Sequence, residues 1–310
     1  MKTKKTLLAL LLAVVLAVGI VAAWLLTRRT PNTEAVRIEV TGTQVDSPFR
    51  FPAAQRMAGR RLLCTGSYLV QPRSLQWQLL RQMRRGQQTP VRLTLTKYRT
   101  PGQLNAHLDT LLACSPAVDI ADFYLFRPDT YEVYWTISTE NLLARMRREW
   151  RKERESLGLH GDTVEIRGVR LGDEELVVLA SIVEEETNYG PEKPLIAAVY
   201  LNRLRRGMPL QADPTVKYAV GDFTLQRILN RHLATESPYN TYLHTGLPPH
   251  PICTPSRQSL RAVVEAADSR DLYFCASDAL DGTHRFAATL AEHNRNARRF
   301  HHALDARGIR

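Results

Sequence analysis

The feature that most constrains the fold is an apolar run at residues 176–183, LVVLASIV, in which Ser181 is the single polar residue. Acidic residues at 173–175 precede the run and suit the first turn of a helix, where exposed backbone N–H groups favour negative charge. A helix that is apolar on all sides has to be buried. We therefore expect a buried helix here, and its last turn carries three consecutive glutamates at 184–186.

The three glutamates allow two interpretations, a solvated helix end or a buried general acid. Successive residues of a helix are rotated by about 100°, so each glutamate has apolar neighbours on the helical wheel. At least one carboxyl group should therefore be partly desolvated, which raises its pKa as a general acid requires. The helical periodicity does not identify which glutamate has that role.

A second apolar segment, residues 7–26, indicates a membrane anchor. Its length matches the roughly 20 helical residues that span a bilayer, whereas the apolar core of a secretory signal has roughly 7–15. Lysines within residues 2–5 precede it, and Arg28 and Arg29 follow it. We expect a single-pass protein of the cell (inner) membrane, with residues 1–6 as a cytoplasmic tail and the long remainder outside the cytoplasm.

The net charge of +11 on 310 residues points to an anionic partner. Such a charge favours nucleic acid, an anionic membrane surface or a carboxylate-rich polymer. Because most of the chain is predicted to be exported, nucleic acid is disfavoured. A merely solubilising role for the charge is the alternative.

The cysteine and histidine patterns predict no metal and no cofactor. The four cysteines, Cys64, Cys114, Cys253 and Cys275, form no C-x-x-C pair, and no H-E-x-x-H occurs. An even number of exported cysteines permits disulfides in three pairings. The apolar surroundings of Cys64 and Cys275 favour free, buried thiols, and the disulfide state stays open.

The order of apolar patterns predicts an α+β chain with several parts after the N-terminal segment. A polar tether with a proline covers residues 27–35. Residues 36–97 alternate short strands with one helix and contain little apolar mass, which indicates a small module. A helical connecting region (98–168) and a mixed helix- and loop-rich domain (169–310) follow.

Two proline-containing loops of the last domain carry groups that suit a sugar. QADPTVKY (211–218) and SPYNTYLHTGLPP (237–249) combine hydroxyl and amide groups with tyrosine rings. Ring faces under a sugar and polar groups for its hydroxyls are typical of a carbohydrate groove. A purely turn-forming role of the prolines and asparagines is the alternative.

Four stretches of the C-terminal half resemble one known family, the membrane-anchored endolytic murein transglycosylases, or YceG-like family. They are LASIVEEET (179–187), AAVYLNRLRRGMPLQADPTVKY (197–218), PYNTYLHTGLPPHPICTP (238–255) and LYFCASDALDGTHRFAATLAEHN (272–294). The chain departs from the family pattern at Arg127, Ala212, His250 and Cys275, positions that concern groove lining and turns.

The resemblance implies an enzyme that cleaves the β-1,4 bond between N-acetylmuramic acid (MurNAc) and N-acetylglucosamine (GlcNAc) within peptidoglycan strands, and so terminates or processes nascent strands. The family's catalytic glutamate, the first in its I-V-E-x-E-T motif, carries over to Glu184. The resemblance also implies a LysM-like domain, which fits residues 36–97, a catalytic domain at 169–310, and partners among peptidoglycan strands and cell-wall synthesis proteins. The candidate substrate-binding residues are Asn202, Arg203, Gln211, Asp213, Thr215, Asn240 and Tyr242.

We expect a neutral Glu184 to protonate the bridging oxygen as general acid and then to act as general base while the sugar's own C6 hydroxyl attacks C1. The product has a 1,6-anhydro-MurNAc end, and this route needs no second carboxylate, unlike that of usual glycosidases. Glu186 could hold the proton on Glu184 through like-charge repulsion. Asp213 could shape a turn, orient the substrate or activate water, and the last role would make the enzyme a hydrolase.

A non-catalytic, membrane-anchored peptidoglycan-binding scaffold is the alternative function. A pure binder has little need for a proton donor at the end of an apolar helix. The sequence therefore favours an enzyme.

Overall fold

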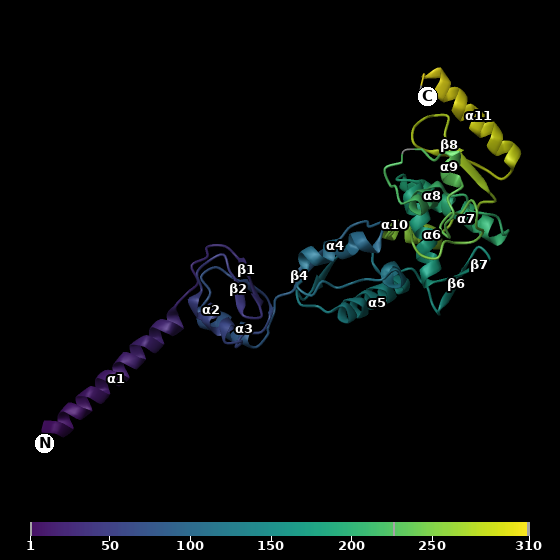
Figure 1. Cartoon of the computed structure of the whole chain (residues 1–310). Helices are drawn as coiled ribbons and strands as arrows, with labels where there is room; N and C mark the ends of the chain where they lie inside the picture. Colours follow the sequence, from purple (N-terminus) through teal and green to yellow (C-terminus); the bar gives the residue numbers. More distant parts are fainter. Residues whose placement is uncertain (1, 226, 309–310) are drawn as a thin grey trace. The chain divides into compact units, whose positions relative to one another are not determined.

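The structure is a computed structural model that describes residues 2–225 and 227–308, without the side chains of residues 2–10. The chain divides into two compact units. The first contains the residues up to Leu93 together with Leu111–Cys114 and Glu132–Ser138, and the second contains Thr94–Thr110, Ser115–Tyr131 and the residues from Thr139 onward. Figure 1 labels the elements of both units.

The first unit has a three-stranded antiparallel sheet packed against two helices (Figure 1). The strands β1 (Val36–Thr41), β2 (Gln44–Asp46) and β3 (Gly66–Val70) lie in the order β2-β1-β3, and the helices are α2 (Pro52–Gly59) and α3 (Gln76–Arg84). Ile38 and Val40 alternate with polar residues along β1, so both point to the buried face. Leu79 and Met83 are four residues apart on α3 and close the same core.

The transmembrane helix predicted over residues 7–26 is wrong. Helix α1 covers Lys2–Thr27, but within the part of the chain that the structure describes no helix is long and apolar enough to cross a membrane. Crossing a bilayer requires about 20 predominantly apolar residues, and residues 7–10 of the predicted segment lie outside the residues whose side chains are described. The fold class is corrected to α+β without this spanning helix.

The strands and helices that follow in the chain lie before α6 (Asp173–Glu186) in the sequence. Strand β4 (Val91–Leu95) pairs with β5 (Asp129–Val133), and α4 (Pro101–Leu111), the short 3₁₀ helix η1 (Ile120–Leu125) and α5 (Thr139–Ser156) complete this part. Leu142, Met146 and Trp150 follow one another at intervals of four residues along α5 and are buried, while charged residues cover its other side.

Helix α6 (Asp173–Glu186) is the centre of the second unit (Figure 1). Helices α7 (Lys193–Arg205), α8 (Asp213–Val220) and α10 (Arg257–Val264) contact it. Every residue from Leu176 to Val183 is buried, so the prediction of a buried helix is confirmed. The Glu175 carboxylate accepts a 2.8 Å hydrogen bond from the Gly172 N–H and caps the first turn.

A tight hairpin leads into α6. Strands β6 (Thr163–Ile166) and β7 (Val169–Gly172) are joined by Arg167 and Gly168, whose φ angles are 53° and 77°. Two residues with positive φ are typical of a type I′ turn, whose twist matches that of the paired strands. The Arg167 guanidinium donates to the Ala267 carbonyl at 2.7 Å and thus holds the hairpin to a distant loop.

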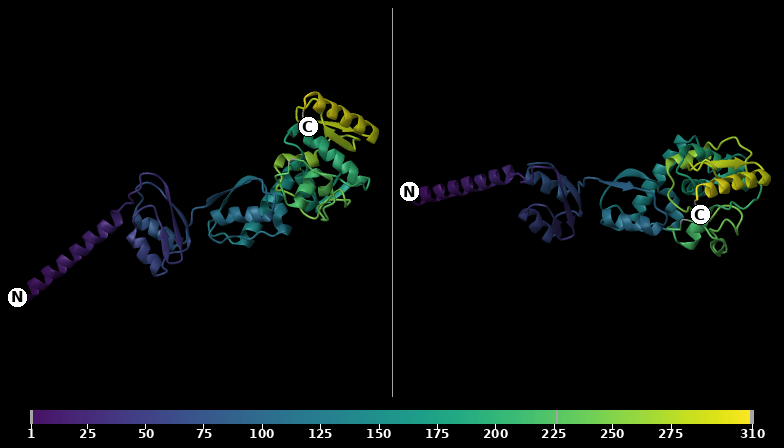
Figure 2. Two further views of the ribbon diagram at one scale, coloured as in Figure 1. Left: turned by 45° about the horizontal axis from the view of Figure 1, so that its top comes forward. Right: turned by 90° about the horizontal axis from the view of Figure 1, so that it is seen from above.

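The C-terminal part adds a second hairpin and a long helix. Its elements are the 3₁₀ helix η2 (Gly190–Glu192), α9 (Asn230–Leu233), β8 (Tyr273–Ala276), β9 (His284–Ala287) and α11 (Leu290–Ala306). Helix α11, drawn in yellow, lies beside the β8–β9 hairpin in Figure 1 and Figure 2.

Ser181, the polar residue within the apolar run, ties a distant loop to α6. Its hydroxyl accepts a 3.0 Å hydrogen bond from the Ile252 N–H, and the Cys253 thiol lies 3.6 Å from the Ser181 carbonyl oxygen. Cys253 is buried, but Cys64 and Cys114 are exposed. The expectation of a buried thiol is therefore wrong for Cys64, and the Cys275 thiol is only partly buried.

Because α6 organises the second unit, a cavity in it should destabilise the fold. Leu179 is fully buried, and we expect Leu179→Ala to lower the free energy of unfolding by about 2–5 kcal/mol. Leu290→Ala is the matched control, since Leu290 is 55% exposed; it should change stability by less than about 0.5 kcal/mol. Urea unfolding followed by circular dichroism measures both, and equal effects would contradict a central role for α6.

Candidate active site

The end of α6 opens into a cavity of about 190 Å³. The residues that line it are Glu186, Arg203, Leu210, Gln211, Asp213, Tyr242 and Phe274. Two carboxyl groups, one guanidinium and two aromatic rings therefore share one cavity, which is the composition of a site for a polar ring-shaped ligand.

Glu186 is the carboxyl group in this cavity that is best suited to hold a proton. Burial raises its pKa to about 7, and the nearby Asp213 carboxylate acts in the same direction. The Tyr200 hydroxyl donates a hydrogen bond to Glu186 Oε1, which lowers the pKa and limits the rise. A carboxyl group with a pKa near 7 exists in both protonation states at neutral pH, as general acid–base catalysis requires.

Asp213 is the second carboxylate of the cavity. It is the first residue of α8, and Pro214 follows it at a position where a missing N–H costs nothing. The Tyr242 hydroxyl donates to Asp213 Oδ1 at 2.7 Å. Burial, followed by this hydrogen bond, raises the pKa of Tyr242. The tyrosine therefore stays a donor and fixes the orientation of the carboxylate.

Arg203 fixes the loop that precedes α8. Its guanidinium donates to the Leu272 carbonyl at 2.6 Å and to the Leu210 carbonyl at 2.8 Å, and it also reaches Gln211 Oε1 at 3.3 Å. Gln211 has a φ of 50°, a left-handed conformation that costs energy for a residue other than glycine. The bonds from Arg203 thus hold a strained residue at the edge of the cavity.

Three further residues predicted to bind substrate are buried and hydrogen-bonded within the fold. The Asn202 side chain donates to the Asp271 carbonyl at 2.9 Å, and the Asn240 side chain donates to the Leu233 carbonyl at the same distance. The Thr215 hydroxyl is 2.8 Å from that of Thr241. None of the three predicted residues lines the cavity, whereas Arg203, Gln211, Asp213 and Tyr242 are brought together there.

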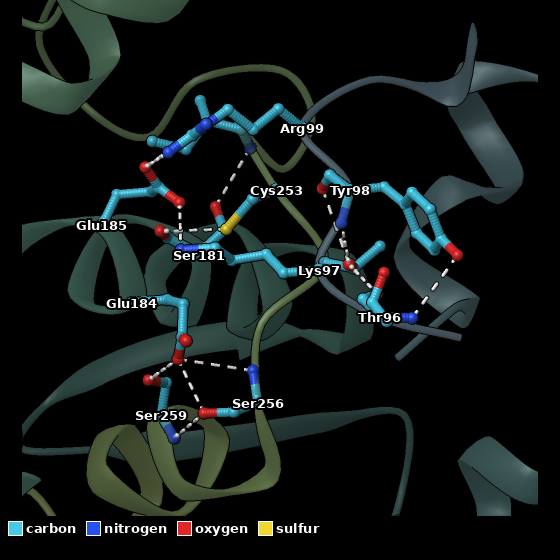
Figure 3. A network of polar contacts seen from close by, with 12 residues as sticks. Thr96, Lys97, Tyr98, Arg99, Ser181, Glu184, Glu185, Cys253, Ser256 and Ser259 are labelled. Carbon is cyan, nitrogen blue, oxygen red and sulfur yellow. Dashed lines mark hydrogen bonds and ion pairs between the residues drawn. The ribbon is translucent and has the colours of Figure 1, made fainter. Parts of the chain in front are cut away.

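Glu184 lies in a different environment, shown in Figure 3. Its Oε2 accepts hydrogen bonds from Lys193 Nζ at 2.9 Å, from the Ser256 hydroxyl at 2.6 Å and from the Ser259 hydroxyl. Burial alone would raise the pKa of Glu184, but the two serines and Lys193 outweigh it, and the pKa is lowered. Glu184 is therefore ionised at neutral pH, and it does not line the cavity that contains Glu186.

Glu185 is held by cations from another segment. It forms ion pairs with Lys97 at 2.8 Å and with Arg99 at 2.9 Å (Figure 3). Burial raises its pKa, but the hydrogen bonds and charges of the two cations outweigh burial and lower it. Of the three glutamates, only Glu186 has a raised pKa.

The sequence patterns did not distinguish Glu186 from the two neighbouring glutamates, and they did not indicate Tyr200 as its hydrogen-bond partner. On the helical wheel each glutamate has apolar neighbours. The hydrogen-bond donors that distinguish the glutamates come from residues 97–99, 193 and 256–259. The contacts of these segments with α6 depend on the tertiary fold.

The sequence of this chain is similar to those of known proteins. A sequence model of the YceG-like family matches residues 33–299. The chain is 40% identical over 131 residues to a protein from Bacillus subtilis named endolytic murein transglycosylase, which covers 42% of this chain. It is 32% identical over 203 residues, or 63% of this chain, to a protein of the same name from Streptococcus pneumoniae strain R6. The chain spans 36% of the length of each of these curated relatives.

A crystal structure of a putative yceG-like protein from Listeria monocytogenes is also similar, with a TM-score of 0.49 and 23% identity. The similarity covers 85% of this chain and 99% of that one. The family match alone extends over most of the chain, which confirms the resemblance seen in the sequence. The chain therefore belongs to the YceG-like family.

Proposed function

We propose that this protein is an endolytic peptidoglycan lytic transglycosylase that cleaves the β-1,4 bond between MurNAc and GlcNAc within glycan strands. The observation that carries the proposal is Glu186, whose pKa is raised by burial to about 7 in a cavity that also contains Asp213. The names of the two bacterial relatives support the same activity. The proposed substrate lies outside the cytoplasm, and we expect the enzyme to act there.

Glu186 is the general acid in this proposal. The protonated carboxyl group donates its proton to the bridging oxygen while the bond from that oxygen to C1 of MurNAc breaks. The GlcNAc portion leaves as an alcohol, and positive charge develops at C1. The Tyr200 hydroxyl hydrogen-bonds Glu186 Oε1, so it stabilises the carboxylate that remains.

The second step returns the proton to the same residue. The C6 hydroxyl of MurNAc attacks C1, and ionised Glu186 accepts the hydroxyl proton. A 1,6-anhydro ring forms, no water is consumed, and Glu186 is ready for another turnover. One carboxyl group thus suffices as acid and base, whereas usual glycosidases need two.

Asp213 stabilises the positive charge at C1 in this mechanism. Its hydrogen bond from Tyr242 keeps it oriented, and a carboxylate near a developing cation lowers the energy of the transition state. The serious alternative is that Asp213 activates water. Cleavage inside strands would in either case terminate or process nascent glycan, and contact with cell-wall synthesis proteins stays a prediction.

Two substitutions, Glu186→Gln and Glu184→Gln, distinguish the two candidate glutamates. We expect Glu186→Gln to lower the rate of strand cleavage by about 10²–10⁴-fold, because a glutamine has no proton to donate. Glu184→Gln should retain cleavage within about tenfold but lower stability by about 3 kcal/mol, since it leaves Lys193, which is 4% exposed, without its anion. Chromatography of released fragments and urea unfolding measure the two effects.

If Glu184→Gln does not fold, the double variant Glu184→Gln/Lys193→Gln removes both charges together and avoids the uncompensated lysine. Loss of cleavage in a folded Glu184 variant, with cleavage retained in Glu186→Gln, would reverse the assignment. It would restore the sequence-based prediction of Glu184 as the acid.

The pH dependence of cleavage should report the Glu186 pKa. A general acid is active below its pKa, so kcat/KM should fall as the pH rises through about 7. Asp213→Asn removes a like charge and should move this fall of kcat/KM to lower pH. Tyr200→Phe removes a hydrogen bond to the carboxylate and should move it to higher pH. Shifts of both variants in the same direction would contradict the assignment.

The product distinguishes the lytic route from hydrolysis. Mass spectrometry of strands digested by the full chain should detect 1,6-anhydro-MurNAc ends. These ends are lighter than reducing ends by the mass of one water, because the proposed reaction adds no water. Reducing ends would instead assign Asp213 as a water-activating base. Absence of cleavage by a folded, strand-binding protein would favour the scaffold.

A further inference from the structure

A second, smaller cavity also lies at the end of α6. Its volume is about 40 Å³, against about 190 Å³ for the cavity that contains Glu186. The residues that line it are Arg99, Glu185, Pro214, Lys217, Tyr218, Phe223 and Ile252. A cavity of about 10–15 Å³ is enough to hold one water. The small cavity therefore has room for a group the size of a carboxylate but not for a sugar ring.

The charges at this small cavity are predominantly positive. Two cations, Arg99 and Lys217, line it with one carboxylate, Glu185. Glu185 is also paired with Lys97, which lies outside the lining. Among the residues that the structure describes, Lys217 has no ion-pair partner. The Arg99 guanidinium lies 5.2 Å from the centre of the Phe223 ring, which holds its plane at the cavity wall. Such a site favours a small anion.

The two cavities share the same backbone segments. Glu185 and Pro214 line the small cavity. Their neighbours in the chain, Glu186 and Asp213, line the large one. Adjacent residues are separated by about 3.8 Å between Cα atoms. Lys217 also acts on Glu186 itself, since its charge lowers the pKa of that carboxyl group. The two cavities are therefore lined by adjacent residues on both α6 and α8.

We propose that the small cavity lined by Arg99 and Lys217 binds a carboxylate carried on the lactyl group of the MurNAc residue that occupies the large cavity. This inference rests on the proposed function. The anionic groups of a peptidoglycan strand are on that substituent, either as the free lactyl carboxylate or as carboxylates of the attached peptide stem. Lys217 supplies the cation that is not already paired, and Arg99 shares its donors with Glu185.

The test measures the affinity of the full chain carrying Glu186→Gln, which binds without cleaving. Three soluble strand preparations are compared by isothermal titration calorimetry: strands with stems, strands without stems that have free lactyl carboxylates, and stemless strands whose carboxylates are converted to neutral amides. We expect at least one anionic preparation to bind about fivefold to tenfold more tightly than the neutral one. The anionic strands that are preferred identify the source of the carboxylate.

Adding Lys217→Gln should remove this preference, and Lys217→Arg should restore most of it. Lys152→Gln is the matched control, because Lys152 is 67% exposed on α5 and pairs with Glu149. Circular dichroism checks that each variant is folded. Equal affinity for all three preparations, or an equal loss for all three in Lys217→Gln, would overturn the proposal.

Cleavage of the same strands by the unsubstituted chain separates this inference from the proposed function. Cleavage without a preference for anionic strands overturns the carboxylate site alone. A Lys217-dependent preference without any cleavage supports the site and overturns the enzyme. Absence of binding to all three preparations overturns both.

Discussion

The burial of α6 is the constraint on which the second unit depends. Eight consecutive residues of this helix are covered by other elements, so its last turn brings three carboxyl groups to partly buried positions. A buried carboxylate is costly unless donors or cations compensate it. The fold meets this cost differently for each glutamate, and the differences produce the chemistry of the site.

Two of the glutamates are compensated by cations and stabilise the architecture. Glu184 connects α6 to α7 through Lys193 and to the start of α10 through Ser256. Glu185 connects α6 to the segment around Arg99. Glu186 has a neutral phenol as its hydrogen-bond donor and a second carboxylate nearby. Since burial acts on all three, the identity of the donors decides which group keeps a proton at neutral pH.

The sequence predicted the buried helix because an all-round apolar pattern has a single stable placement in water. It also predicted that Arg203, Gln211, Asp213 and Tyr242 belong to one site, because the segments that contain them resemble the family motifs. It could not separate these residues from Asn202 and similar polar residues, whose side chains turn inward to brace backbone carbonyls. In the sequence, a polar side chain that binds substrate looks the same as one that braces the backbone.

The sequence pattern alone did not distinguish the three glutamates for a related reason, and the assignment of Glu184 rested on the family resemblance. A motif gives positions along a helix, but the pKa depends on partners that approach from distant segments, such as Ser259 for Glu184 and Tyr200 for Glu186. The predicted spanning helix rested on apolar length alone, and the described part of the chain contains no helix that meets that requirement.

In the proposed mechanism, the same arrangement would couple substrate recognition to catalysis. The end of α6 and the start of α8 line both cavities, so a ligand in the small cavity changes the field at Glu186. In the free protein, the Lys217 charge lowers the Glu186 pKa. A bound carboxylate would neutralise that charge and let the pKa rise, so that Glu186 holds its proton more firmly when the substrate carries its anion. Substrate binding would thereby favour the protonation state that the first chemical step requires.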